Sequence, residues 1–338
     1  MSLSRRHVLA AGLAAPLAAP AVLRAQSASV TLGYIPVLGS AQPFVIEGEG
    51  WAREAGINLK LIRFDSGPAM AQALSSGQLD FYLAGIGPVI VSRAAGIDVA
   101  VVAAAAIEEL GVLARGPLAT ALNAEGSISA AIARFTREQG RRPKIAAQPP
   151  GSVPHTALRW WLEERSKVPA AAVDLVSMSI DASNQALLAG TVDASTAREP
   201  MITIVRDRDR AVQVAAAGKD IWPGQPGSVL AAVRPHDPSR RAAIDAVVHL
   251  HRRATEVLAT KPQSVVRHVH RGLGGGLVPQ QVFERALVSP FTKFAADPAA
   301  IVAATAEMQD YQQRLGVLKD TVAMADLFDH GPWQRSAA

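Results

Sequence analysis

The sequence contains no cysteine among its 338 residues. Disulfide bonds and thiolate metal sites are therefore excluded, and we expect no lipid-modified N-terminal cysteine. Long apolar runs are also lacking. The run from Val8 to Leu23 has sixteen residues and is interrupted by Pro16 and Pro20, whereas a membrane-spanning helix needs about 20 apolar residues. No later run is as long, so we expect no transmembrane helix.

The sequence signatures of several common catalytic sites are missing as well. The chain has no HExxH, no GxSxG and no adjacent Ser-His-Asp pattern. Gly85-Ile-Gly87 resembles the start of a dinucleotide-binding fingerprint, but Ile90 stands where its third glycine belongs. We therefore expect a protein that binds a ligand without converting it, with no cofactor and no metal.

The N-terminal residues have the features of an export signal. Ser4-Arg5-Arg6-His7-Val8-Leu9 is a twin-arginine start, and small residues near Ala25-Gln-Ser-Ala28 follow the apolar run. We predict that residues 1–28 form a cleaved twin-arginine-type signal peptide and that the mature chain is free in the bacterial periplasm. The alternative is a disordered N-terminus without a targeting role.

Removal of this segment changes the charge balance. The whole chain has 34 basic and 29 acidic residues, and loss of Arg5, Arg6 and Arg24 leaves 31 against 29. A net charge of this size gives little non-specific attraction to phosphate, so we expect no nucleic-acid partner. We interpret the basic clusters at 141–142, 206–210 and 252–253 as solvated faces.

The length of the mature chain and its order of elements predict two α/β lobes. Short β-rich runs alternate with helical patterns, which is typical of parallel strands with helices on both faces. The expected strands are 30–35, 58–64, 79–84, 99–104, 144–148, 173–178, 194–197 and 229–233. We assign 29–114 and 229–338 to lobe 1 and 115–228 to lobe 2, with a crossover at 221–228. The glycine-rich segment 272–276 is expected to be a loop.

Glycine, serine and proline gather where strands are expected to turn into helices. Ser66 can cap the helix that begins at Pro68, and proline in the first helical turn loses no needed hydrogen bond. Gly85 and Gly87 allow the backbone to come close before Pro88 starts the next helix. The first-turn N–H groups then stay available to a ligand.

The second lobe repeats this arrangement. Gly151-Ser152 is followed by Pro154 at an expected helix start. Ligands of parallel sheets bind at the carboxyl ends of the strands, where these turns lie. We therefore predict that three helix starts converge on one cleft suited to an oxyanion.

Several ordered motifs together resemble one family. They are Gly33-Tyr-Ile-Pro36, Phe64-Asp-Ser-Gly-Pro68, Leu74-Ser-Ser-Gly-Gln-Leu-Asp80, Ala84-Gly-Ile-Gly-Pro88, Ala94-Ala-Gly-Ile-Asp-Val99, Pro149-Pro-Gly-Ser-Val-Pro-His155, Leu188-Ala-Gly-Thr-Val-Asp193 and Glu199-Pro200. The chain resembles the substrate-binding proteins of ABC importers of the nitrate, sulfonate and taurine group. The resemblance implies the type II periplasmic binding fold, α/β with two doubly wound sheets joined by a two-strand hinge. It also implies a monomer that closes on its ligand and delivers it to an ABC permease and its ATPase.

These considerations give a set of expected ligand-binding residues: Tyr34, Ser40, Ser66, Gly67, Gly85, Ile86, Gly151, Ser152, His155, Glu199 and Trp222. Each has an alternative role. Ser66 can serve only as a cap, His155 as a solvated surface residue, and Glu199 as a brace of the hinge. Tyr34 can belong to the core, and Trp222 can form either a hydrophobic wall or a hinge wedge.

These residues do not determine the identity of the ligand. The stretch 130–142 is longer than in many relatives, and Leu38-Gly39-Ser40 matches the family only in being small and polar. A sulfonate, taurine or nitrate is expected, and a pyrimidine or another heteroaromatic compound is the rival. A sensory module would use the same cleft. Enzymes of the thiamine-pyrimidine type are disfavoured, because they depend on cysteine.

Overall fold

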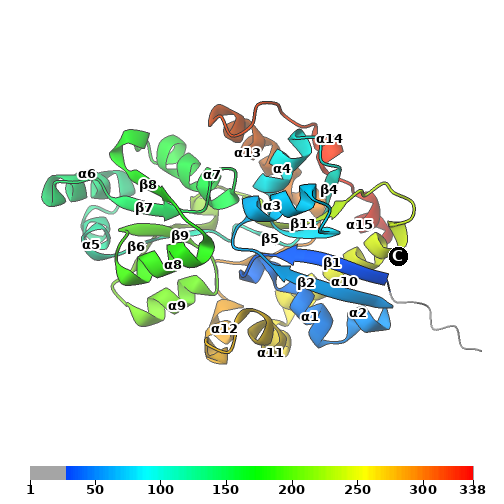
Figure 1. Ribbon diagram of the computed structural model, residues 1–338. Coiled ribbons are helices and arrows are strands. Elements are labelled where there is room, and N and C mark those ends of the chain that lie inside the picture. Colours follow the sequence, from blue (N-terminus) through cyan, green and yellow to red (C-terminus); the bar gives the residue numbers. More distant parts are fainter. Residues whose placement is uncertain (1–27, 338) are drawn as a thin grey trace, which may run out of the picture.

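The computed structural model describes residues 28–337, and Figure 1 shows two lobes side by side. The predicted signal peptide therefore lies, except for Ala28, outside the described residues. Over the described range, none of the helices combines the length and apolarity that a membrane crossing requires.

Each lobe is built on a five-stranded sheet. In the first, the order is β2 (Ile57–Arg63), β1 (Ala28–Tyr34), β3 (Phe81–Gly85), β11 (Ser228–Val233) and β4 (Val99–Ala104). In the second, it is β8 (Asp174–Ser177), β7 (Lys144–Ala147), β9 (Ala194–Ala197), β6 (Gly111–Ala114) and β10 (Gln213–Ala217). The two lobes share one plan, as the α/β class predicted.

The sheets are mixed rather than purely parallel. β11 pairs antiparallel with both β3 and β4, and β6 pairs antiparallel with both β9 and β10. Each of these two strands is the first that the chain forms after it crosses from the other lobe, so it enters its sheet in the opposite direction. β6 and β10 were not predicted from the sequence. β6 belongs to the second sheet although it lies just before the lobe boundary predicted at residue 115.

Helices cover both faces of the sheets. Those packed on the first lobe are α1 (Gln42–Gly48), α2 (Trp51–Glu54), α3 (Gly67–Ser75), α4 (Ile86–Ala94), α10 (Arg241–Thr260), α11 (Pro262–Leu273), α12 (Gln280–Ala286), α13 (Val302–Arg314), α14 (Met324–Leu327) and α15 (Gly331–Arg335). Those of the second lobe are α5 (Gly116–Glu125), α6 (Ile128–Gln139), α7 (Val153–Trp160), α8 (Ile180–Ala189) and α9 (Met201–Arg208). The long stretch at 130–142 is thus mostly helix α6, which Ser127 caps.

The hinge consists of two neighbouring chain crossings. Ala105 N donates to Ser228 O at 2.9 Å, Gly227 N donates to Ala106 O at 3.2 Å, and Glu108 N donates to Gln225 O at 3.0 Å. The first crossing contains β5 (Ala106–Ile107), which pairs antiparallel with β12 (Lys293–Phe294) in a short two-stranded sheet. The two-strand hinge is therefore present.

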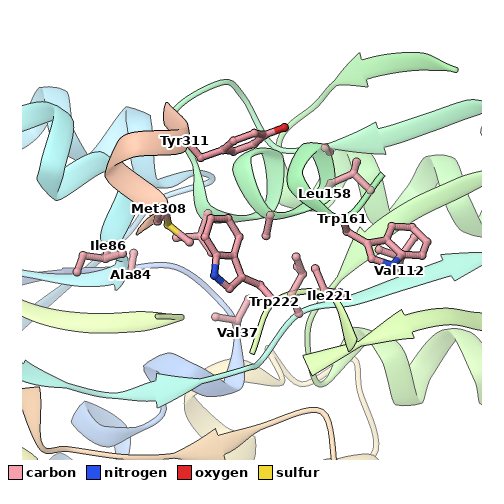
Figure 2. Close-up of a cluster of buried hydrophobic side chains, with 14 of the residues drawn as sticks. Val37, Ala84, Ile86, Val112, Leu158, Trp161, Ile221, Trp222, Met308 and Tyr311 are labelled. Carbon is pink, nitrogen blue, oxygen red and sulfur yellow. The ribbon is translucent and has the colours of Figure 1, made fainter. Parts of the chain in front are cut away.

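The buried core does not stop at the lobe boundary. One cluster of buried apolar side chains contains Val89 and Ile90 of the first lobe together with Leu158 and Trp161 of the second. Figure 2 shows part of this cluster around Trp222. The lobes are thus in contact over an apolar area, and opening them would expose part of it to water.

A buried histidine ties α10 to the first sheet. His251 is 2 % exposed, and its Nε2 lies 2.7 Å from the carbonyl oxygen of Ala104. The neutral imidazole donates this bond from Nε2. Burial lowers the pKa of His251 from 6.5 to about 4, so the folded protein resists protonation here.

This burial predicts a loss of stability on acidification. Below pH 6.5 the unfolded histidine takes up a proton that the folded one accepts only near pH 4. The free energy of unfolding should fall by up to about 3 kcal/mol across this window. Urea unfolding of the wild type and His251→Gln, measured from pH 7 downward, should show a shallower decline in the variant. The exposed His236→Gln serves as control, and equal declines in all three would contradict the assignment.

Candidate functional site

A cavity of about 290 Å³ lies between the two lobes. The first lobe contributes Pro36, Val37, Arg63, Leu273, Gly275 and Val278, and the second contributes Gln148, Ile180, Asp181, Asn184, Arg198, Pro200, Met201 and Ile204. Arg63 is the last residue of β2, Gln148 and Arg198 directly follow β7 and β9, and Pro36 lies two residues after β1. The cavity thus occupies the edge where the carboxyl ends of the parallel strands meet, as expected for a ligand site of this architecture.

Arg198 is the most firmly held cation of the cavity. Its side chain is 7 % exposed, and Nη1 donates to Glu109 Oε1 at 3.2 Å. The same carboxylate oxygen accepts the hydroxyl of Ser228 at 2.7 Å. Glu109 lies in the first crossing and Ser228 begins β11, so the hinge itself holds the guanidinium at the cavity wall.

A second cation, Arg63, closes the cavity from the first lobe. Its Nη2 lies 2.5 Å from Asp181 of the second lobe, and its Nη1 lies 2.9 Å from Asp65. Ile180 N at the start of α8 also donates to Asp65 O at 3.2 Å. These side chains are half exposed, so the ion pairs add little stability. They do fix the start of α8 against the end of β2.

Other contacts between the lobes show that the cleft is closed. Leu38 N donates to Glu199 O at 2.9 Å. On the opposite side, Gln312 of α13 donates to Gly151 O at 3.1 Å and to Thr156 Oγ1 at 3.2 Å. The cavity is therefore the space left between lobes that already touch on both sides of it.

The predicted helix starts do converge at the seam between the lobes. A Cβ atom at Gly85 would lie 2.9 Å from the Val153 side chain, and one at Gly67 would lie 2.7 Å from Pro88. Such distances leave no space for a side chain at either glycine. A Cβ atom at Gly87 would likewise clash with the carbonyl oxygen of Gly151. A separate pocket of about 670 Å³, lined by Pro68, Pro88 and Gly151 among others, lies beside these helix starts.

The hydroxyl groups predicted to bind ligand serve as helix caps here. Ser66 Oγ accepts Ala69 N at 3.3 Å, and Ser152 Oγ accepts His155 N at 3.3 Å. His155 is half buried, and burial lowers its pKa to about 4, so the side chain is neutral near pH 7. Its Nδ1 has no partner among the described residues.

Three further predicted residues lie in the core of the first lobe. Tyr34 packs edge-on against Phe44 with ring centroids 5.0 Å apart. Ser40 is fully buried and donates to Leu83 O at 3.2 Å. Ile86 is fully buried as well. For Tyr34 this is the alternative role considered from the sequence.

Glu199 lies next to the cavity but faces away from it. The residue is 1 % exposed, follows Arg198 and forms a cis peptide bond with Pro200. Its carboxylate accepts Thr203 N at 3.0 Å and Thr203 Oγ1 at 2.9 Å, and burial raises its pKa. Its two chain neighbours line the cavity, whereas Glu199 lines a groove on the outer side.

Trp222 is held between helices that belong to different lobes. It stacks on Trp160 of α7 with ring centroids 4.6 Å apart, and it meets Tyr311 of α13 edge-on at 6.2 Å. Its Nε1 donates to Glu307 at 3.4 Å. Figure 2 shows the indole near Met308 and Tyr311, inside the buried cluster. Of the two alternative roles considered for Trp222, hydrophobic wall and hinge wedge, this position fits the hinge wedge.

None of the residues predicted to bind ligand is among the described residues that line the cavity. Five polar residues line it instead and were not predicted from the sequence: Arg63, Gln148, Asp181, Asn184 and Arg198. A usable signal was present for three of them, because Arg63 ends β2, Gln148 follows β7 and Arg198 follows β9. Among residues 28–337, no group of three or more potential metal-binding side chains gathers.

Sequence comparison identifies one family. Residues 24–268 match the sequence profile of the NMT1-like family. A 216-residue segment is 29 % identical to the nitrate import ATP-binding protein NrtC of Synechococcus elongatus and covers 62 % of the chain. The chain spans 32 % of the length of that relative.

Comparison of folds gives solved structures of similar architecture. The periplasmic nitrate-binding protein NrtA from Synechocystis PCC 6803 superposes with a TM-score of 0.76 at 13 % identity, over 92 % of this chain and 89 % of NrtA. The alkanesulfonate-binding protein SsuA from Xanthomonas axonopodis pv. citri, bound to MOPS, gives 0.70 at 20 % identity, over 90 % and 99 %. A C27S mutant of DszB with biphenyl-2-sulfinic acid gives 0.63 at 14 %, over 92 % and 99 %. These likenesses confirm the type II periplasmic binding fold.

The buried pair at the hinge makes a prediction about stability. Arg198→Met leaves the Glu109 carboxylate buried without its cation, which should lower the free energy of unfolding by about 3–5 kcal/mol. Adding Glu109→Gln removes the uncompensated charge, and Ser228 can still donate to the amide oxygen. Urea unfolding should therefore find the double variant more stable than Arg198→Met alone. Strictly additive losses from the two substitutions would show that the pair is not coupled.

Proposed function

The chain belongs to the NMT1-like family, and from this membership and its fold we propose that it is the solute-binding component of an ABC importer. The ligand is a small organic or inorganic anion of the sulfonate, taurine or nitrate type. The protein works as a monomer in the periplasm after removal of its signal peptide, and it delivers the ligand to a permease and its ATPase. Proteins of similar fold bind nitrate, alkanesulfonate and a sulfinic acid, and these ligands support this class of anion.

The observation that carries the proposal is the guanidinium of Arg198 at the wall of a closed interlobe cavity. Its Nη1 donates to Glu109, and the other N–H groups of the guanidinium can donate to an anion. The amides of Gln148 and Asn184 line the same space and can donate as well. The volume of about 290 Å³ is at the small end of the range for ligand pockets.

The charges and wall residues favour an anion over a heteroaromatic ligand. Two arginines and one aspartate line the cavity, so its lining has one excess positive charge. The part of the lining that the structure describes includes no aromatic side chain on which a pyrimidine could stack. The chain also lacks cysteine, the residue replaced in the DszB variant. Capture without catalysis is therefore the function we propose.

Hinge closure provides the mechanism. An anion that contacts Arg198 on the second lobe and Arg63 on the first binds the closed form better than the open form. Such a difference in affinity shifts the population toward closure. In the closed form the ligand replaces part of the interaction between Arg63 and Asp181.

Ligand identity can be tested with a thermal-shift screen followed by calorimetry. We expect nitrate, taurine or one of the alkanesulfonates to raise the melting temperature, because a ligand that binds only the folded form stabilises it. Uracil and cytosine represent the heteroaromatic rival. A response to these two and to none of the anions would contradict the proposed class.

The position of the ligand can be tested with matched variants. Arg63→Gln removes a charged donor of the cavity and should weaken binding of the best anion about tenfold. Arg93→Gln, which removes a similar ion-paired arginine on the outer side of α4, should leave the affinity unchanged. The pair Ser66→Ala and Ser152→Ala tests the helix starts that the sequence predicted. Lost affinity in that pair, with none lost in Arg63→Gln, would place the ligand at the helix starts instead.

A further inference from the structure

The alternating sequence Arg206-Asp-Arg-Asp-Arg210 is divided by the fold into paired acids and free bases. Asp207 forms an ion pair with Arg285 of α12. Asp209 accepts Ala211 N at 3.0 Å and lies 3.5 Å from Arg115. Neither Arg206 nor Arg210 has an acidic partner anywhere in residues 28–337. Arg208 has none either, so all three cations of the motif lack an ion-pair partner among these residues, and the interpretation as a uniformly solvated face is incomplete. Of these three, Arg206 and Arg210 line one groove.

These two cations face a groove between the lobes. The groove has a volume of about 760 Å³ and lies on the outer side of Glu199. The second lobe contributes Glu199, Ile202, Thr203, Arg206, Asp207 and Arg210, and the first contributes Arg285, Ser289, Pro290 and Phe291. Arg206 belongs to α9, and Arg210 follows two residues after the helix ends at Arg208. Both line the groove. Arg208, two residues from each, does not line the groove.

The acidic groups of the groove do not cancel this charge. Three guanidinium groups face it, against the carboxyls of Glu199 and Asp207. Asp207 is occupied by Arg285. Glu199 is bonded to Thr203. Three guanidinium groups against these two carboxylates leave one excess positive charge even when both carboxyls are ionised. The groove consequently keeps a positive charge, whereas the interlobe cavity lies on the other side of the 198–200 segment.

We propose that this groove is a second anion site, separate from the interlobe cavity, for a ligand with two or more carboxylate or phosphate groups. Guanidinium groups pair with both kinds of acid through two parallel hydrogen bonds. One acidic group of the ligand pairs with Arg206 and Arg210 on the second lobe, and another shares Arg285 of the first lobe with Asp207. A ligand with a single charge cannot engage both sides of the groove in this way.

The groove is formed by both lobes, so its ligand binds the closed form. If the proposed importer function holds, occupation of the groove and of the cavity favour the same conformation. Each ligand then raises the affinity for the other, because the coupling between two sites is reciprocal. The second site would act as a sensor of an acidic metabolite that adjusts capture of the first ligand.

The test uses calorimetric titration of pyrophosphate and of citrate into the purified chain at low ionic strength. We expect saturable binding of at least one of them, and the better probe identifies phosphate or carboxylate as the preferred acid. Arg206→Gln, Arg210→Gln and Arg285→Gln should each weaken binding about tenfold, which is typical of a lost charged hydrogen bond. Arg208→Gln makes the same change of charge in the same motif and should alter the affinity less than twofold.

Three results would overturn the proposal. The first is that neither probe shows saturable binding. The second is that Arg208→Gln weakens binding as much as the three groove substitutions do. The third is that Arg63→Gln abolishes binding, which would place the probe in the interlobe cavity. Circular dichroism of each variant checks that the fold is retained. Because pyrophosphate and citrate are tested without the cavity ligand, failure of the proposed importer function would leave this result standing.

Discussion

The contact of Glu109 with Arg198 and Ser228 is the interaction on which the rest of the molecule depends. It joins the first chain crossing, the end of β9 and the start of β11 in one buried cluster. Two opposite charges removed from water have to stay paired, because an isolated buried charge is very costly. The cluster therefore fixes how the lobes meet, and at the same time it presents the free part of a guanidinium to the interlobe cavity. Hinge geometry and ligand chemistry share one set of side chains.

The sheet topology explains why this cluster lies where it does. Both sheets place an antiparallel strand, β11 or β6, beside three strands that run in parallel. In each case the antiparallel strand is the one that arrives from the other lobe. The two crossings consequently run side by side, with three backbone hydrogen bonds between them. Carboxyl ends of the parallel strands from both sheets then face each other next to the hinge, and the cavity forms between them.

The lobes are held together differently on the two sides of this cavity. On one side, Arg63 forms half-exposed ion pairs with Asp65 and Asp181, which can exchange partners at little cost. On the other side, Trp222 lies between Trp160 and Tyr311, and Gln312 bonds to the start of α7. A weak polar contact near the ligand and an apolar contact away from it suit a protein that opens and closes about a fixed seam. The groove lined by Arg206 and Arg285 lies on the polar side of the same seam.

Local sequence determined the helix starts, the alternating elements and the family. Ser66 and Ser152 cap their helices as predicted, because capping involves only residues three positions apart. The α/β class also followed from the order of turns and strands, and the two-strand hinge followed from the resemblance to the family. The short strands β6 and β10 were missed, since they are stabilised by pairing with distant strands rather than by a pattern of their own.

Only the tertiary structure decided which polar residues face the cavity. Arg63 and Arg198 lie 135 positions apart in the sequence, and they come to one cavity because two sheets meet at their carboxyl edges. The direction in which Glu199 and Trp222 point was decided in the same way, by contacts with Thr203 and with Trp160 that no local pattern encodes. Spacing along the chain sets the conformation of a turn, whereas the surroundings of a side chain depend on which distant segments fold against it.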